Sequence, residues 1–100
     1  MAYVSIVRVR ARPEGRDTIE TGIAQLMAGR RAWRESGDLL ASQAVRGDDG
    51  ASYTLVSVWR DRAAHDRHED APEEGEATRR LASALAGPPE ETGGEVVADL

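Results

Sequence analysis

The chain of 100 residues contains no Cys, no Lys, no Asn and no Phe. Without a thiol it has no thiolate nucleophile, no thiolate metal site and no disulfide. Without lysine it has neither a Schiff-base amine nor the lysine of a phosphate-binding P-loop, and all 13 basic residues are Arg. These absences exclude several large classes of enzyme and metal protein.

Acidic residues outnumber basic ones, 18 against 13, which gives a formal net charge of -5. Binding to a nucleic-acid backbone needs a clustered cationic face, so we expect no nucleic-acid partner. The sequence has no run of about 18 apolar residues and no cationic, apolar leader. We therefore expect no membrane span and a cytoplasmic protein.

A chain of this length supports one hydrophobic core, which would bury roughly 60 to 65% of the surface that the unfolded chain exposes. We expect a single domain over residues 1–100. Only four residues are aromatic, so the core is modest and built from Val, Leu, Ile and Ala. Association with another chain would therefore add stability.

The first half of the chain predicts a strand followed by a helix. Alternating residues predict a strand over 3–12, which Pro13 ends. An apolar stripe at helical spacing predicts a helix that Asp17 or Thr18 caps and that Gly37 stops. The stripe consists of Ile19, Ile23, Leu26 and Met27, with Arg30 and Trp33 near its far end.

Two further strands form a predicted hairpin. The first covers 39–46, the turn residues occupy 47–50, and the second runs from Ala51 to Trp59. On the second strand, one side carries Tyr53, Leu55, Ser57 and Trp59. The opposite side is also largely apolar, so this strand needs a covering on each face.

The remainder predicts a helix over 61–70, an interruption at Pro72, a helix over 73–86 and, after a loose linker, a strand over 95–100. The resulting order is that of an α+β, ferredoxin-like split β-α-β fold with a four-stranded antiparallel sheet. All helices would cover one face. We expect a homodimer in which two sheets pack face to face, with a pocket between sheet and helices in each subunit.

A set of short features follows the chain in a particular order. They are the turn Pro13-Glu14-Gly15, Trp33 before Gly37-Asp38-Leu39-Leu40, the strand end Val58-Trp59-Arg60-Asp61, His68 nine residues beyond Trp59, and Gly87-Pro88-Pro89. In this order and at these spacings the chain resembles the antibiotic biosynthesis monooxygenase family of dimeric α+β barrels, over nearly its whole length.

Within that family the chain is most similar to cofactor-free oxygenases that convert aromatic polyketide anthrones to quinones. The resemblance implies that the substrate supplies the electrons, that dioxygen is the second substrate and that no cofactor is needed. A phenolic anthrone would lose a proton, and its carbanion or enolate would pass an electron to dioxygen in a shaped apolar pocket.

The resemblance also implies a set of site residues. In those enzymes a pocket Trp ends the third strand, which corresponds to Trp59. Four residues earlier they have an Asn where this chain has Leu55, and six residues later a Tyr where it has His65. An Arg on their last helix corresponds approximately to Arg79. The predicted catalytic residues are thus Trp59, His65 and Arg79, with one polar group missing at Leu55.

The haem-degrading branch of the family fits less well. Its Asn, Trp and His positions fall here at Arg8, His68 and Thr78, so we expect no haem. Five residues are secondary candidates for contact with a substrate: Tyr53, Leu55, Ser57, Trp33 and His68.

Each catalytic candidate also has a purely structural alternative. Trp59 can be core rather than a wall for a flat aromatic ligand. His65 can be a partly exposed helix residue rather than the base for a phenolic proton. Arg79, or Arg80 beside it, can pair with surface carboxylates rather than stabilise an enolate or superoxide.

A metal site is a further alternative, because His65, His68 and Glu69 share one helical face and could hold non-haem iron or zinc. Their surroundings are mostly polar, and we expect no metal. Two other functions remain open on the same fold. One is a polyketide cyclase or other non-oxidative tailoring enzyme, and the other is a non-catalytic, ligand-binding accessory dimer.

Overall fold

The computed structural model describes residues 1–69 and 71–100, in which strands and helices follow the predicted order. The elements are β1 (Tyr3–Arg10), α1 (Arg16–Gly29), α2 (Arg31–Ser36), β2 (Leu39–Arg46), β3 (Ser52–Trp59), α3 (Arg62–Glu69), α4 (Pro72–Ala82) and β4 (Glu90–Glu95). Two consecutive helices occupy each helical position of the β-α-β-β-α-β pattern. The predicted α+β, ferredoxin-like fold is confirmed.

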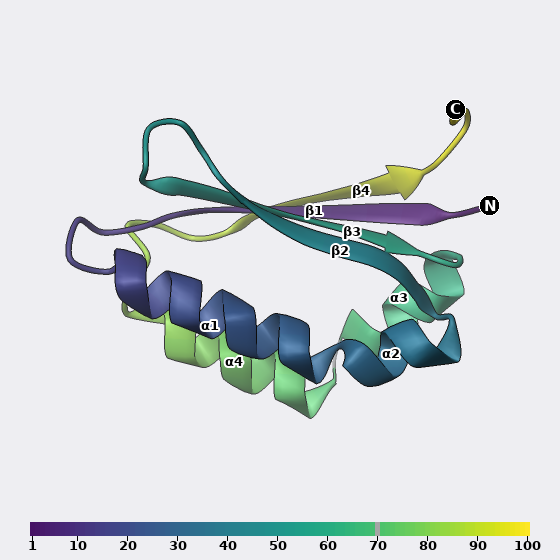
Figure 1. Ribbon diagram of the computed structural model, residues 1–100, viewed down its shortest axis with the longest axis horizontal. Coiled ribbons are helices and arrows are strands. Elements are labelled where there is room, and N and C mark those ends of the chain that lie inside the picture. Colours follow the sequence, from purple (N-terminus) through teal and green to yellow (C-terminus); the bar gives the residue numbers. More distant parts are fainter. Residues whose placement is uncertain (70) are drawn as a thin grey trace.

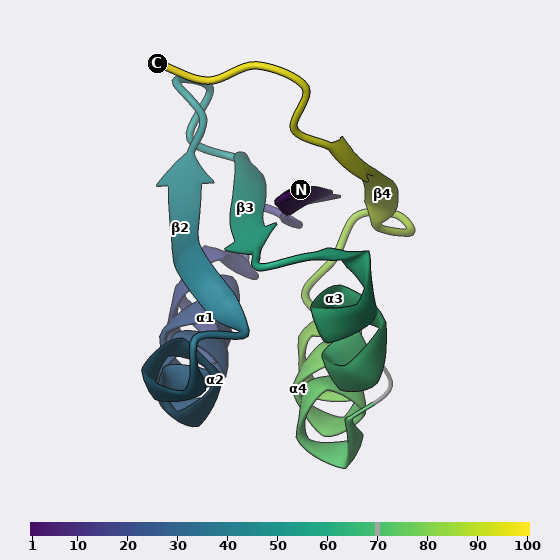
Figure 2. The same ribbon diagram turned by 90° about the vertical axis from the view of Figure 1, so that its right-hand side faces the viewer.

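The four strands form one antiparallel sheet in the order β2-β3-β1-β4. All four helices lie on the same side of it (Figure 1). Seen end on, α1 and α2 lie under β2, whereas α3 and α4 lie beneath the half of the sheet that carries β4 (Figure 2). The central strands β1 and β3 thus pass over the space between two helical columns.

The main core lies between β3 and α1. Along β3 the residues Tyr53, Leu55, Ser57 and Trp59 are all buried, while the residues between them are half-buried. Ile19 and Ile23 of α1 are buried against the same face. Because β3 alternates strictly, every second side chain of this strand faces the helices, as its sequence predicts.

Some of the helix ends predicted from the sequence are confirmed and one is wrong. Gly37 has φ = 85° and ends α2, as predicted, because a left-handed residue is best supplied by Gly. The carboxylate of Asp61 accepts a hydrogen bond from the backbone N–H of Ala64 at 2.8 Å and so caps α3. The expected cap at Asp17 or Thr18 is wrong, because α1 begins after Gly15 with no side-chain cap.

The prediction of the last strand is also wrong. We expected a linker over 90–94 and a strand over 95–100, but β4 is Glu90–Glu95 and all its residues are exposed. Gly residues disfavour strands, yet β4 forms a ladder with β1 in which Gly93 lies opposite Ser5. Backbone pairing with a central strand outweighs the low strand propensity of this segment.

Gly93 is also required for close packing. A Cβ atom built at Gly93 would overlap the hydroxyl of Tyr3. We expect Gly93→Ala to lower the free energy of unfolding by about 1–3 kcal/mol, the usual effect of overpacking. In a Tyr3→Val background the same change should have less effect, which urea denaturation of the four variants measures as a coupling free energy. Equal losses in both backgrounds would contradict this contact.

The β2–β3 hairpin is held by Asp49. Its carboxylate accepts hydrogen bonds at 2.9 Å from the backbone N–H groups of Ala51 and Ser52, and from the Ser52 hydroxyl. These donors favour the ionised carboxylate and lower the pKa of Asp49 from 3.8 to about 2.

This carboxylate should make the hairpin sensitive to acid. Because the pKa of Asp49 is lower in the folded chain, its contribution is complete above pH 3.8 and is lost as the pH falls towards 2. Asp49→Ala should therefore be less stable than wild type at neutral pH, and the two melting curves should converge in acid. Thermal unfolding across this range tests the expectation, and a constant difference in stability would contradict it.

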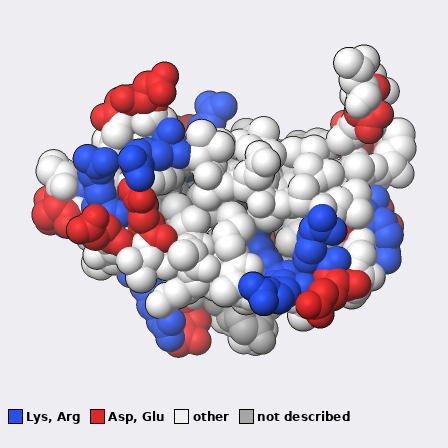
Figure 3. Space-filling view, viewed as in Figure 1, with Lys and Arg blue, Asp and Glu red and all other residues white. Residues whose placement is uncertain are grey.

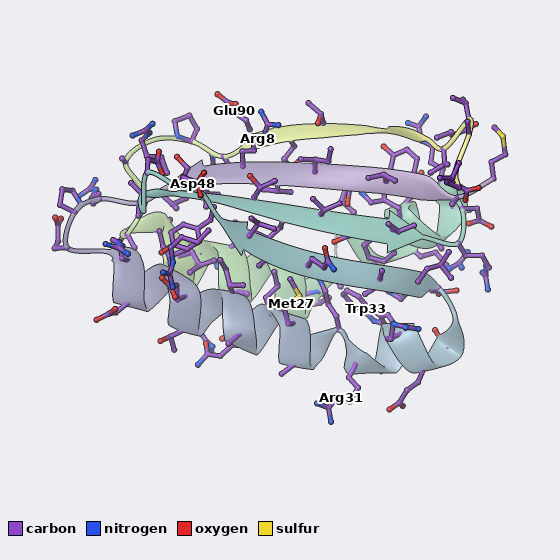
Figure 4. The ribbon with its side chains drawn as sticks, turned by 45° about the horizontal axis from the view of Figure 1, so that its top comes forward. Arg8, Met27, Arg31, Trp33, Asp48 and Glu90 are labelled. Carbon is purple, nitrogen blue, oxygen red and sulfur yellow. The ribbon has the colours of Figure 1, made fainter. Side chains whose placement is uncertain are left out.

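Among the described residues, no helix covers the other face of the sheet (Figure 1). It carries the half-buried, mostly apolar residues Val4, Ile6, Thr54, Val56 and Val58. We call this the open face. Charged groups lie at its margin, where Arg8 and Glu90 are opposite each other on β1 and β4 (Figure 4). Figure 3 views the sheet edge-on, and uncharged side chains occupy the middle of the visible surface, with charged groups towards its two ends.

Among the described residues, every helix is too short or too polar to cross a membrane.

Candidate functional site

A cavity of about 320 Å³ lies between the helix-covered face of the sheet and helices α1, α3 and α4. Its interior is apolar and is lined by Val7, Val9, Ile19, Ile23, Leu26, Leu55, Leu81 and Leu85. One end, which we call the polar end, contains the indole of Trp59 together with Tyr3, Ser5, Arg30, His65 and His68. The polar residues Glu69, Thr78, Glu91 and Thr92 also contribute to the lining. An apolar body with a few polar groups is typical of small-molecule sites.

Trp59 forms the floor of the polar end. It is only 2% exposed, and its Nε1–H donates a hydrogen bond to the Ser5 hydroxyl at 3.1 Å. This bond fixes the indole plane and occupies its one donor. Trp59 is therefore mainly a core residue, and little of its surface is open to a ligand in the cavity.

His65 lies beside the indole. Its ring is 5.5 Å from that of Trp59 in an edge-on arrangement, and 4.9 Å from the ring of Tyr3. The side chain is 15% exposed, and its Nδ1 is 2.9 Å from the carboxylate of Asp66. The sequence-predicted pair of Trp59 and His65 is thus brought together at one end of the cavity.

His68 lies on the same helix face, one turn further along. It stacks on Trp33 with ring centroids 4.2 Å apart, and its Nε2 is 2.9 Å from the carboxylate of Asp38. The carboxylate of Asp38 also forms ion pairs with the guanidinium groups of Arg67 and Arg60, with N–O distances of 3.1 and 2.9 Å. The hydrogen bond with His68, and then the one from Arg67, hold the pKa of Asp38 below its ordinary value.

Trp33 contacts the site through this stack and through the ring of Trp59, whose centroid is 6.1 Å from its own. It does not line the cavity but lies in α2 between the helix and the sheet, whereas Arg31 beside it points away from the sheet (Figure 4). Its effect on a ligand would therefore pass through His68 and Trp59.

Arg30 brings a guanidinium to the cavity from the junction of α1 and α2. Its Nη1 donates to the hydroxyls of Ser57 at 2.8 Å and Ser42 at 3.1 Å, and its Cζ lies 5.8 Å from the centre of the Trp59 ring. Ser57 is buried, and it meets Arg30 and Ser42 rather than the cavity. The predicted substrate contact at Ser57 is therefore indirect in this arrangement.

Two predicted residues lie elsewhere. The hydroxyl of Tyr53 donates to Glu20 at 2.6 Å, and Glu20 also accepts from Arg46 at 2.9 Å. These two donors, Tyr53 first, lower the pKa of Glu20. Arg79 is exposed and does not line the cavity, and Arg80 pairs with Glu76 at 2.6 Å.

Leu55 lines the apolar part of the cavity. The wall therefore has a hydrocarbon side chain at the position where the resemblance places an Asn.

Sequence reasoning did not single out Tyr3, Ser5 and Arg30 as site residues. Tyr3 and Ser5 share the helix-facing side of β1 with Val7 and Val9. The alternation of that strand could therefore have identified them. Arg30 lies at a break between two helices that the sequence predicts as one. Nothing local distinguishes it from the other Arg residues.

One cluster has the chemistry of a metal site. In the described part of the chain, ligand atoms of His65, Asp66 and Glu69 lie within 4.8 Å of one another. Both carboxylates are exposed, and His68 of the sequence hypothesis is engaged by Asp38 instead. Exposed acidic groups of this kind are common without an ion, so the cluster supports no metal role.

Comparison with known proteins adds a family and a set of structures. A family model described as "Antibiotic biosynthesis monooxygenase" matches residues 2–80. No curated protein matches the sequence.

Several solved structures share the fold at low sequence identity. Rv0793 from Mycobacterium tuberculosis is 19% identical with a TM-score of 0.87, over 99% of this chain and 98% of that one. A putative antibiotic biosynthesis monooxygenase from Caulobacter crescentus is 16% identical with a TM-score of 0.86, over 97% and 91%. An Asn-to-Ala variant of SnoaB, a cofactor-independent oxygenase from Streptomyces nogalater, is 19% identical with a TM-score of 0.83, over 99% and 96%. These likenesses establish the fold.

Proposed function

The chain belongs to the antibiotic biosynthesis monooxygenase family, and on this premise we propose that it is a cofactor-independent monooxygenase that oxidises an anthrone-type aromatic substrate with dioxygen. One observation carries the proposal. The apolar cavity of about 320 Å³ has His65 and Trp59 together at its polar end. SnoaB, which shares the fold, is itself described as a cofactor-independent oxygenase.

In the proposed reaction the substrate lies in the apolar cavity, with its reacting carbon at the polar end that Trp59 and His65 line. His65 removes a proton, because an imidazole nitrogen can act as a general base and the ring is held at the cavity wall. The resulting anion is electron-rich and lies in a largely apolar space, where it transfers an electron to dioxygen. The protein supplies shape and proton transfer, and the substrate supplies the electrons.

Positive charge near the anion would favour its formation. The sequence assigns this role to Arg79, which remains a prediction, since its exposed side chain does not line the cavity. Arg30 is the described Arg that lines it. We include Arg30 in the proposed site because its guanidinium lies 5.8 Å from the centre of the Trp59 ring.

Leu55 favours a second candidate on the same fold. A hydrocarbon at this point of the wall offers no hydrogen bond to a substrate oxygen or to dioxygen. A cyclase or other non-oxidative tailoring enzyme would not need one, and His65 would then act as an acid or base. Product mass separates the two, since the oxygenase adds oxygen and the cyclase removes water.

The open face supports a homodimer as the assembled form. Half-buried Val and Ile side chains without a covering layer are expected to associate, and a copy of the same face is the simplest complement. Dimerisation would also suit the alternative of a non-catalytic accessory protein. In that case substitutions at Trp59 and His65 would leave biological output intact, whereas disruption of the dimer would abolish it.

The decisive experiment incubates the protein with an anthrone in air and under argon. We expect quinone absorbance and oxygen uptake above the uncatalysed rate in air, and neither under argon. A Trp59→Leu variant should lower the rate, while Ala63→Gln, an exposed change on α3, should not. Oxygen uptake equal to the uncatalysed rate would remove the oxygenase proposal.

A further inference from the structure

Leu81 of α4 lies between the cavity and the outside of the molecule. It lines the cavity together with Thr78, which is one turn earlier on the same face of α4. It also lines a groove on the outer side of α1 and α4. Of the described residues that line the cavity or this outer groove, Leu81 is the one that the two share.

The two spaces beside Leu81 differ in chemistry. The other residues of the outer groove, apart from Gly22, are polar and exposed, namely Asp17, Thr18, Thr21, Gln25 and Arg80. On its inner side Leu81 packs against the core cluster that contains Ile19, Ile23 and Leu85, which also line the cavity. A hydrocarbon side chain is more stable against apolar groups than in water, so the Leu81 side chain favours the inner side.

Gly22 of α1 determines how far Leu81 extends away from the cavity. A Cβ atom built at Gly22 would overlap Cδ2 of Leu81 and would lie 3.0 Å from its Cγ. Gly is unfavourable inside a helix, and here it leaves a gap in α1 that the tip of Leu81 fills. A methyl group at position 22 would displace this tip, and the apolar cavity is the favoured direction.

Gly29 has no such contact. It belongs to the same helix, but a Cβ atom built there would meet no other group within 4 Å. The two positions therefore allow the same methyl group to be added to α1 with and without pressure on Leu81.

Resting on the proposed function, we propose that Leu81, seated on Gly22, determines the size of the aromatic substrate that the cavity accepts. Leu81 forms the wall that a ring system meets on the α4 side. A shorter side chain at position 81 enlarges the space for a ligand, and a methyl group at position 22 reduces it. Leu81 is thus a specificity-determining residue.

The size of the effect follows from the number of carbon atoms. Burial of one methylene group changes affinity by about fourfold. Leu81→Ala removes three carbon atoms from the wall, so the gain for a ligand that fills the new space reaches about 50-fold. Gly22→Ala adds one carbon atom, which corresponds to about a fourfold change in the opposite direction.

The test compares the binding of anthraquinone, with three fused rings, and tetracenequinone, with four. Trp fluorescence gives the two dissociation constants, and their ratio measures size selectivity. We expect Leu81→Ala to shift this ratio towards tetracenequinone by about 10- to 50-fold, and Leu81→Val, which removes one carbon atom, to shift it by about fourfold. Leu81→Val also tests the proposal if Leu81→Ala does not fold.

Gly22→Ala should shift the ratio by about fourfold towards anthraquinone, whereas Gly29→Ala, the matched control, should leave it unchanged. In the double variant Gly22→Ala/Leu81→Ala the added methyl group meets no leucine, so the ratio should equal that of Leu81→Ala alone.

Equal changes in affinity for both quinones on substitution of Leu81 would indicate a purely structural role and would overturn the proposal. An effect of Gly29→Ala as large as that of Gly22→Ala would do the same, as would failure of wild type to bind either quinone. A wild type that binds the quinones and shows the expected shifts, but takes up no oxygen with an anthrone, would defeat the proposed function alone.

Discussion

Replacement of His65 by Gln is expected to lower the rate of quinone formation by about 10²–10⁴-fold, the range typical of a lost general base. The ring of His65 lines the cavity beside Trp59, and its hydrogen bond is to the exposed Asp66. Its removal should therefore change the chemistry far more than the fold. The loss should fall on kcat, because the cavity that binds the aromatic rings stays intact.

The measurement is single-turnover oxidation of an anthrone, followed by quinone absorbance, together with binding of an inert anthraquinone by Trp fluorescence. Ala63→Gln introduces the same side chain two residues away at an exposed position and serves as the control. A His65→Gln protein that bound the anthraquinone normally and turned over at the wild-type rate would remove His65 from the mechanism.

The fold was predictable where local pattern and burial agree. The alternation of β3 identified its buried side. Gly37 marked a helix end through its left-handed backbone, and Asp61 marked another through its side-chain cap. The position of β4 was not predictable in this way. Its pairing with β1 is long-range, and Gly93 suits it only because the Tyr3 side chain lies against it.

The site was predictable to the extent that its residues lie close in sequence. Trp59 and His65 are separated by one strand-to-helix turn, so their proximity follows from local structure. The roles of Ser57 and Tyr53 depend on distant partners, namely Arg30 at the junction of α1 and α2 and Glu20 of α1, which no local pattern pairs with β3. Similarly, Arg30 reaches the cavity through a helix break that the apolar stripe of α1 does not reveal.

Replacement of Val56 by Asp is expected to convert the proposed dimer into a monomer. Val56 lies on β3 opposite Ile6 of β1, in the middle of the open face. An unpaired charge in an interface typically costs about 2–5 kcal/mol, and a two-fold axis introduces it twice. The dissociation constant of the dimer should therefore rise by at least about 10³-fold, since each 1.4 kcal/mol is a factor of ten.

Light scattering at micromolar concentration measures the change, with Arg31→Asp as the control because this side chain points away from the sheet (Figure 4). Wild type and the control should have twice the mass of Val56→Asp. The fold of the variant should persist, because Val56 faces away from the helix-covered core and its backbone ladder with β1 and β2 is unchanged. A monomeric wild type would contradict the dimer directly, since the half-buried apolar side chains of the open face would then be stable in water without a covering layer.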